Sequence, residues 1–163
     1  MIRDQRGFGL GFGGSVFETV GLPLIIMAVL GWFAWGAFGD YQARTRVVAG
    51  LARAAAAQAA VDKAFALRGS LAFPAALQAH WSPPAPDEFV QSIRVEDNGV
   101  ITLRFTARVA EDGENQIQIV PVVQDRALDL GAASNAGLKY AWQCGGAAGR
   151  STVPSARRPD TCR

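Results

Sequence analysis

An uninterrupted uncharged stretch covers residues 19–39, close to the N-terminus. A helix needs about 20 apolar residues to cross the hydrocarbon core of a bilayer, and this stretch supplies 21. Trp32 and Trp35 stand near its C-terminal end, where amphipathic rings favour the headgroup boundary. The stretch is too long and too rich in glycine for the apolar core of a secretory signal, and no small-x-small cleavage pattern follows it. We therefore predict a membrane-spanning helix at about residues 19–39 that stays in the mature protein.

The helix is predicted to continue beyond the membrane span. The following residues, 40–67, are rich in Ala, Arg and Gln, which are strong helix formers. Positions at alternating steps of four and three form one helical face: Val47, Leu51, Ala54, Gln58, Val61 and Phe65. Gly69 and Ser70 provide a stop signal. We expect one long helix over residues 15–68 and a connecting loop over residues 69–88.

Strand patterns begin after this proline-rich loop. Four alternating runs are expected as antiparallel strands: residues 89–95, 100–106, 116–123 and the shorter 139–144. Asn98 and Gly99 lie between the first two runs, which is the strongest short-range signal for a hairpin. Residues 127–137 are too irregular to assign. Because a sheet with one apolar face needs a cover, we predict an α+β fold. Its long N-terminal helix packs on a three- to four-stranded antiparallel sheet in a domain over residues 89–163.

The chain has two cysteines, Cys144 and Cys162, in a region without histidine. Such a pair cannot supply the four ligands of a structural zinc site. A disulfide is the better interpretation and implies an oxidising compartment, although two unrelated buried thiols remain the alternative. The arginines on both sides of the membrane span do not settle its orientation. If the cysteines pair, they close a loop over residues 144–162 and place the C-terminal domain outside the cytoplasm.

The charge of the chain is small but unevenly placed. A net charge of +2 over 163 residues does not by itself suggest nucleic-acid binding. The terminal segment, however, holds four arginines against the single acid Asp160: Arg150, Arg157, Arg158 and Arg163. One hypothesis is that these arginines contact an anionic partner such as DNA or an acidic polysaccharide. The alternative is a solvated loop whose charges keep the protein soluble.

An enzymatic role is not indicated. His80 is the only histidine and stands beside Trp81 in an apparent loop. Ser, Asp and Lys show no nucleophile arrangement, and the glycine-rich run over residues 7–14 precedes a membrane span rather than following a strand, so it is not a phosphate loop. We predict a non-enzymatic protein without a cofactor.

The membrane-exit segment and the C-terminus resemble those of type IVa pilins. Residues 34–47 are similar to the segment in which the family has Pro-Ala-Tyr-Gln-Asp-Tyr-x-Ala-Arg before an alanine-rich helix. The Asn-Gly hairpin and the ending over residues 142–163 are similar to the family's sheet and disulfide-bounded loop. Gly36 stands where the family usually has a helix-kinking proline, whereas Pro23 lies earlier in the span.

The resemblance implies a structural subunit of a type IV pilus. Such a subunit is stored in the inner membrane of a Gram-negative bacterium and processed by a prepilin peptidase. The pilus assembly machinery then extracts it into a helical filament of identical subunits, which packs the N-terminal helices and serves adhesion, twitching motility or DNA uptake. The alternatives are a minor pilin or secretion pseudopilin, and an uncleaved single-pass membrane protein with a pilin-like binding domain.

Residues 1–14 are expected to be a leader or a glycine-rich N-terminal segment. The family's leader ends in glycine, before an N-methylated phenylalanine and with glutamate at the fifth mature position. Gly7 precedes a phenylalanine but lacks the acid at that position. Cutting after Gly13 makes Glu18 the fifth residue, and cutting after Gly14 makes it the fourth.

Glu18 has two compatible interpretations. A carboxylate at the membrane-entering end of a helix is costly unless it is neutralised, and the resemblance implies that it neutralises the N-terminal amine of an adjacent subunit during assembly. Ser15 and Glu18 also match a capping box, in which serine is the N-cap and glutamate stands three residues later.

Overall fold

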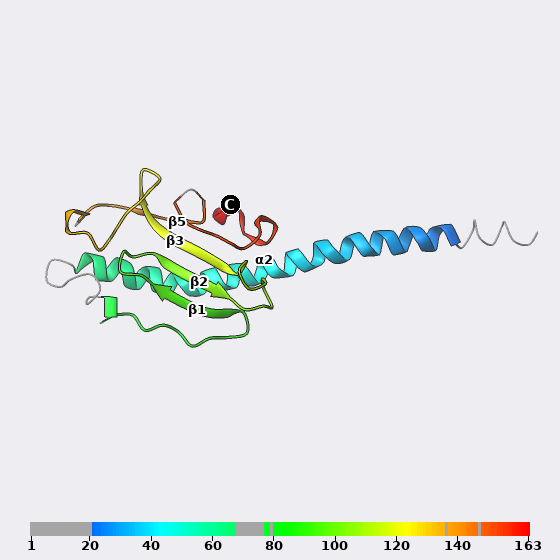
Figure 1. The fold of residues 1–163 in the computed structure, drawn as a ribbon, viewed down its shortest axis with the longest axis horizontal. Coiled ribbons are helices and arrows are strands. Elements are labelled where there is room, and N and C mark those ends of the chain that lie inside the picture. Colours follow the sequence, from blue (N-terminus) through cyan, green and yellow to red (C-terminus); the bar gives the residue numbers. More distant parts are fainter. Residues whose placement is uncertain (1–20, 68–76, 79, 136, 147) are drawn as a thin grey trace, which may run out of the picture. The chain divides into compact units, whose positions relative to one another are not determined.

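The computed structural model describes residues 21–67, 77–78, 80–135, 137–146 and 148–163 (Figure 1). The chain divides into two compact units, Met1–Gly39 and Asp40–Arg163, and each is described by itself. The expected leader, residues 15–20 and 68 of the expected helix, and residues 69–76 and 79 of the expected connecting loop lie outside the described residues.

One α-helix, α2 (Leu22–Ala66), begins in the first unit and ends in the second. The long helix expected from the sequence is therefore present over 45 residues. Pro23 is the second residue of α2. A missing backbone N–H costs little in the first turn of a helix, because the N–H groups there have no partner within the helix. The last turn closes with a hydrogen bond from the Leu67 amide to the Lys63 carbonyl at 3.1 Å.

The second unit contains a five-stranded antiparallel sheet. Its strands are β1 (Val90–Val95), β2 (Ile101–Phe105), β3 (Gln116–Val123), β4 (Arg126–Ala127) and β5 (Ala141–Cys144). They pair in the order β1-β2-β3-β4, and β5 also pairs with β3. Three short 3₁₀ turns follow the third hairpin and the last strand: η2 (Ala133–Asn135), η3 (Ser155–Arg157) and η4 (Asp160–Cys162).

The four predicted strands are present, but the two-residue β4 was not predicted. It pairs with the end of β3 through a tight turn at Gln124 and Asp125, whose φ angles are 49° and 61°. Turns of this left-handed kind usually carry Asn or Gly, so the sequence gives no hairpin signal there. The predicted Asn98-Gly99 turn joins β1 to β2, with Gly99 at a φ of 87°.

The core lies between one face of the sheet and the part of α2 in the second unit. Ile93, Ile101, Leu103 and Phe105 are buried from the sheet side. The buried helix positions are mostly small: Ala43, Val47, Gly50, Ala54, Ala57, Ala60, Val61 and Ala64. Three positions of the predicted stripe, Leu51, Gln58 and Phe65, are only half-buried. The stripe predicted from the sequence is therefore centred slightly to one side of the buried helix face, because the alanines and the glycine of that face carry little hydrophobic signal.

The other face of the sheet is covered unevenly. Val120 and Val122 of β3 form a second buried cluster with Val100, and Ala148 of the terminal segment packs against it. The same face of β1 and β2 carries polar side chains that are exposed or half-buried. The C-terminal segment thus covers β3 and leaves the outer side of β1 and β2 open.

Candidate assembly surface and terminal loop

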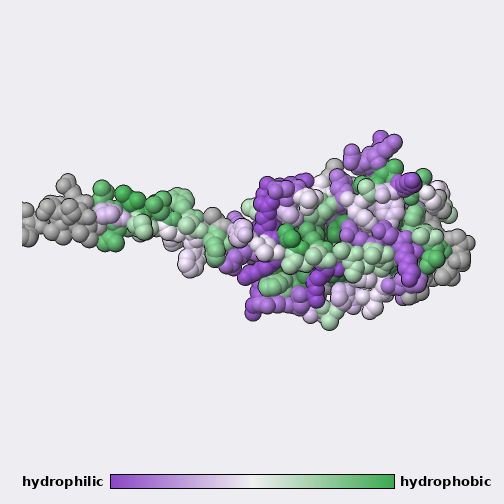
Figure 2. Space-filling view, turned by 180° about the vertical axis from the view of Figure 1, so that it is seen from behind, coloured by the Kyte–Doolittle hydropathy of each residue, from purple (hydrophilic) through white to green (hydrophobic). Residues whose placement is uncertain are grey.

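The part of α2 in the first unit exposes its large apolar side chains to solvent. Those more than half exposed include Leu22, Leu24, Ile25, Met27, Leu30, Trp32, Phe33, Trp35 and Phe38. An 18-residue window of this helix has a mean hydropathy of 1.8, and none of it is buried. Figure 2 shows mostly hydrophobic or neutral side chains along the described residues of this unit. By length and composition the helix can cross a membrane, and an apolar surface of this extent requires lipid or another apolar partner.

The part of α2 in the second unit has an exposed face without charge. Its members recur at steps of three and four: Thr45, Val48, Ala49, Ala52, Ala55, Ala56 and Ala59. We call these residues the alanine face. Lys63 follows at the same angular position, five full turns after Thr45, and is the first charge on this face. Small uncharged side chains allow the backbone of another helix to approach closely, so the alanine face is suited to helix–helix packing.

The C-terminal loop is closed by a disulfide. Cys144, the last residue of β5, is bonded to Cys162 in η4, with 4.6 Å between their Cα atoms. Cys162 is buried. The C-terminal disulfide expected from the sequence is thus present and ties the end of the chain to the sheet.

Two ion pairs of opposite polarity fasten this loop to α2. The Arg157 Nε donates to Asp40 Oδ1 at 3.0 Å, and the Arg44 guanidinium donates to Asp160 Oδ2 at 2.7 Å. Arg157 also donates to the carbonyl oxygen of Val109 at 3.3 Å. We call the Asp40–Arg157 and Arg44–Asp160 pairs the loop clasp. Helix and loop each contribute one acid and one base, so the two segments match in charge.

Comparison with known proteins identifies the family. The family described as Pilin (bacterial filament) matches residues 43–163, about three quarters of the chain. The chain belongs to the pilin family.

A solved structure has the same fold. It is the crystal structure of a Pseudomonas aeruginosa (strain Pa110594) type IV pilin, which matches with a TM-score of 0.60 and 23% sequence identity. The match covers 74% of this chain and 97% of that chain. No curated protein matches this pilin in sequence. The resemblance to type IV pilins inferred from the sequence is therefore confirmed at the level of family and fold.

The arginines predicted to meet an anionic partner are mostly engaged within this pilin. Arg157 belongs to the loop clasp, Arg158 donates to the Cys162 carbonyl at 3.3 Å, and Arg163 pairs with Asp160 at 2.9 Å. The side chain of Arg150 is exposed and has no hydrogen bond or ion pair within the described residues. Sequence reasoning missed the acid partner on α2, because it stands more than a hundred positions before the loop.

Two carboxylates, Asp62 of α2 and Asp87 before β1, link the helix to the sheet. Asp62 Oδ1 accepts the Tyr140 hydroxyl at 2.5 Å and the Trp142 indole N–H at 3.2 Å. Burial, together with the neighbouring Asp62 carboxylate, raises the pKa of Tyr140. These bonds hold the β5 side of the sheet against the helix.

The second carboxylate, Asp87, stands just before β1. Its Oδ1 accepts the backbone N–H groups of Val90 at 2.5 Å and Phe89 at 2.9 Å, and its Oδ2 pairs with Arg53 of α2. The bond from the Val90 amide is the main cause that lowers the pKa of Asp87, and the Phe89 amide and Arg53 act in the same direction. Asp87 therefore links the start of the edge strand to the helix.

The remaining predicted positions are not placed. Glu18 and the processing candidates Gly7, Gly13 and Gly14 lie outside the described residues. Within the described ranges, no group of three or more His, Cys, Asp or Glu side chains could hold a metal ion.

Proposed function

We propose that this pilin is a structural subunit of a type IV pilus, assembled into a helical filament by packing of its N-terminal helices. The role is structural and includes no enzymatic step. Membership of a family of filament proteins and the fold shared with a type IV pilin support the proposal.

The exposed, uncharged surface of α2 is the observation that carries this proposal. Large apolar side chains are exposed before residue 40, and the alanine face is exposed after it. An apolar helix can exchange lipid for identical neighbours at little hydrophobic cost, since both surroundings are apolar. A surface helix of a soluble domain usually carries charged residues on its solvent-facing side. In the second unit, the alanine face of α2 presents methyl groups there instead. Both parts of α2 thus suit a filament core built from helices of neighbouring copies.

The resemblance to type IV pilins supports the life cycle that we propose for this subunit. The subunit is held in the inner membrane of a Gram-negative bacterium before assembly, with its disulfide-bonded domain on the oxidising side. A prepilin peptidase removes the leader after Gly7, Gly13 or Gly14, the mature N-terminus is methylated, and the pilus assembly machinery extracts the subunit. Glu18 then neutralises the N-terminal amine of an adjacent copy, and the finished filament lies outside the cell, where it serves adhesion, motility or DNA uptake.

Two other roles compete with that of a major filament subunit. A minor pilin or secretion pseudopilin would use the same helix surface in small amounts, and the disulfide-closed terminal loop favours a true pilin. An uncleaved single-pass membrane protein would keep residues 1–14 and would not enter a filament. The amount of the protein in sheared surface filaments and the mass of its N-terminal peptide separate these roles.

The alanine face provides a sharper test. Ala52→Glu and Ala56→Glu each place a charge on this face, and we expect either variant to be absent from the sheared filament fraction although the membrane-held subunit accumulates normally. Ala133→Glu, at an exposed position of η2, is the matched control and should enter filaments. Wild-type levels of filament from both alanine-face variants would contradict the proposal.

A further inference from the structure

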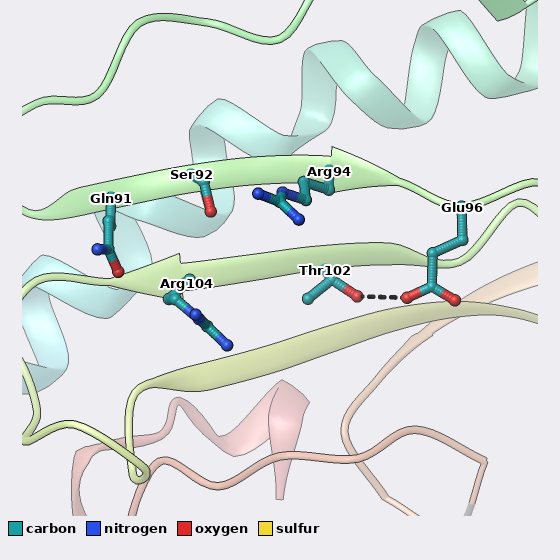
Figure 3. A pocket seen from close by; sticks show the side chains of 6 residues that line it. All are labelled: Gln91, Ser92, Arg94, Glu96, Thr102 and Arg104. Carbon is teal, nitrogen blue, oxygen red and sulfur yellow. Dashed lines mark hydrogen bonds between the residues drawn. The ribbon is translucent and has the colours of Figure 1, made fainter.

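The outer face of β1 and β2 contains an open groove of about 460 Å³. Its lining consists of Gln91, Ser92, Arg94, Glu96, Thr102 and Arg104 (Figure 3). These side chains lie on the side of the sheet that faces away from α2. The groove runs along β1, a six-residue strand that is about 20 Å long.

Two arginines in this groove have no partner in the part of the chain that the structure describes. Within the described residues, neither Arg94 nor Arg104 forms an ion pair or a side-chain hydrogen bond, whereas Glu96 accepts the Thr102 hydroxyl at 3.0 Å. Arg94 is paired in register with Thr102, and Arg104 with Ser92. The two arginines are therefore diagonal neighbours, with Cα atoms roughly 7–8 Å apart. Two guanidinium groups this close, each with free donors, form a site for negative charge.

A β-bulge adds a polar side chain beside this pair. The register of β1 against β2 shifts between Val90 and Ser92, so Gln91 is an extra residue opposite the partner strand. Bulges redirect side chains and are common next to functional sites. Here both Gln91 and Ser92 line the groove. The groove therefore carries amide and hydroxyl groups beside its two cations, and these groups can donate and accept hydrogen bonds.

We propose that this groove binds an acidic polysaccharide whose sugar rings carry carboxylates. Carboxylates spaced along the polymer pair with Arg94 and Arg104 through two parallel N–H···O bonds each. The sugar hydroxyls exchange hydrogen bonds with Gln91, Ser92 and Thr102. The proposal concerns the sheet face, a surface separate from the terminal loop and from the helix surface proposed for assembly.

Nucleic acid fits the groove less well. No aromatic side chain is among the lining residues, so the groove lacks the stacking platforms on which single-stranded bases bind. Duplex DNA carries a dense row of phosphates and is held by many cations, yet the chain has a net charge of only +2. Asp112 lines the adjoining hollow together with Arg104, which further weakens the attraction for a dense polyanion. A sparsely charged polymer suits two arginines better.

The test uses the full chain in detergent, so it does not depend on filament assembly. Binding is measured to immobilised polygalacturonate, to the same polymer fully methyl-esterified, and to duplex DNA. We expect binding to polygalacturonate only, falling as salt rises. Arg94→Gln combined with Arg104→Gln should weaken it about tenfold or more, and Arg104→Lys, which keeps the charge but not the planar fork, should weaken it less.

The matched control removes the same charge elsewhere. Arg126 and Lys139 are exposed and have no ion pair within the described part of the chain, so Arg126→Gln combined with Lys139→Gln should bind like the unaltered protein. Equal losses in the two double variants would show a general charge effect and overturn the proposal. So would tighter binding to DNA than to polygalacturonate, or no polymer binding at all. If the groove double variant aggregates, Arg94 protects the edge strand β1. Arg104→Lys, which stays charged, is then the test, and unchanged binding of this variant to polygalacturonate would overturn the proposal.

Discussion

Asp40 and Arg157 are joined at 3.0 Å although 117 positions separate them in the chain. Asp40 is the first residue of the second unit, and Arg157 lies in the disulfide-bounded loop. With the second pair, Arg44 and Asp160, the loop clasp fixes the C-terminal loop beside the start of the domain part of α2. The disulfide ties the loop to the sheet, and the clasp ties it to the helix.

We expect the clasp to contribute a small, salt-dependent stability. The side chains of Asp40 and Arg157 are 45% and 33% exposed, so their coupling in a double-mutant cycle should be about 0.5 kcal/mol. The cycle uses Asp40→Asn, Arg157→Gln and the double variant, with urea unfolding of the full chain in detergent. Arg150→Gln, which removes an exposed arginine of the same loop, is the control and should change stability little. A coupling unchanged by 0.5 M salt would be inconsistent with an exposed ion pair.

The architecture could be predicted because its signals are local. The apolar stretch before residue 40, the four alternating strand patterns and the Asn-Gly turn each act through nearby residues. The centre of the helix stripe could not be placed, because its contacts are made by alanines and Gly50. Their burial depends on how closely the sheet approaches the helix, which is a property of the assembled domain.

Gly50 marks the closest approach of the helix to the sheet. A Cβ atom at this position would lie 2.5 Å from Phe105 Cε1 and 3.1 Å from Val90 Cγ2. We expect Gly50→Ala to destabilise the domain by about 1–2 kcal/mol, because the overpacking exceeds the gain in helix propensity of about 1 kcal/mol. Ala49→Leu enlarges the adjacent but exposed position and should change the unfolding midpoint little. A Gly50→Ala protein more stable than the original would mean that the sheet can move away at no cost.

The charged sites were harder to predict than the fold. The terminal arginines were recognisable in the sequence, and so was Asp160, three positions before its partner Arg163, but Asp40 reaches Arg157 only through tertiary proximity. The groove arginines, Arg94 and Arg104, carried no sequence signal beyond lying in predicted strands. Only the register of β1 against β2, with its bulge, brings them side by side. Local patterns therefore predict where a charge lies but not whether another side chain already neutralises it.

Asp87 should make stability depend on pH in the acid range. Its folded-state pKa is lowered, so the unfolded chain takes up the proton first as pH falls. The stabilisation is complete above the unfolded value of about 3.9 and is lost progressively below it. We expect Asp87→Ala to cost about 1–2 kcal/mol at pH 7, because two backbone N–H groups lose their acceptor.

The isosteric variant separates the charge of Asp87 from its geometry. Asp87→Asn keeps an oxygen for the Val90 and Phe89 amides but cannot ionise. Its stability should therefore fall less steeply than that of the unaltered protein between about pH 4 and pH 2.5, a range that begins near the pKa of a free carboxyl, about 3.9, and extends below it. Thermal unfolding at a series of pH values measures this slope. Identical slopes for the two proteins would assign the acid sensitivity to other carboxylates.

Glu18 is expected to act in assembly more than in folding. A carboxylate at the apolar end of the helix is useful only to a positive partner or to helix-end amides. We expect Glu18→Ala to reduce sheared filament about tenfold or more, since one charge of a desolvated pair is left alone, while the disulfide-bonded domain unfolds at its normal midpoint. Glu18→Asp keeps the charge and should retain part of the assembly. Ser15→Ala removes only the proposed N-cap. If Ser15→Ala fails to assemble to the same extent, or if Glu18→Ala assembles normally, then Glu18 is a capping residue alone.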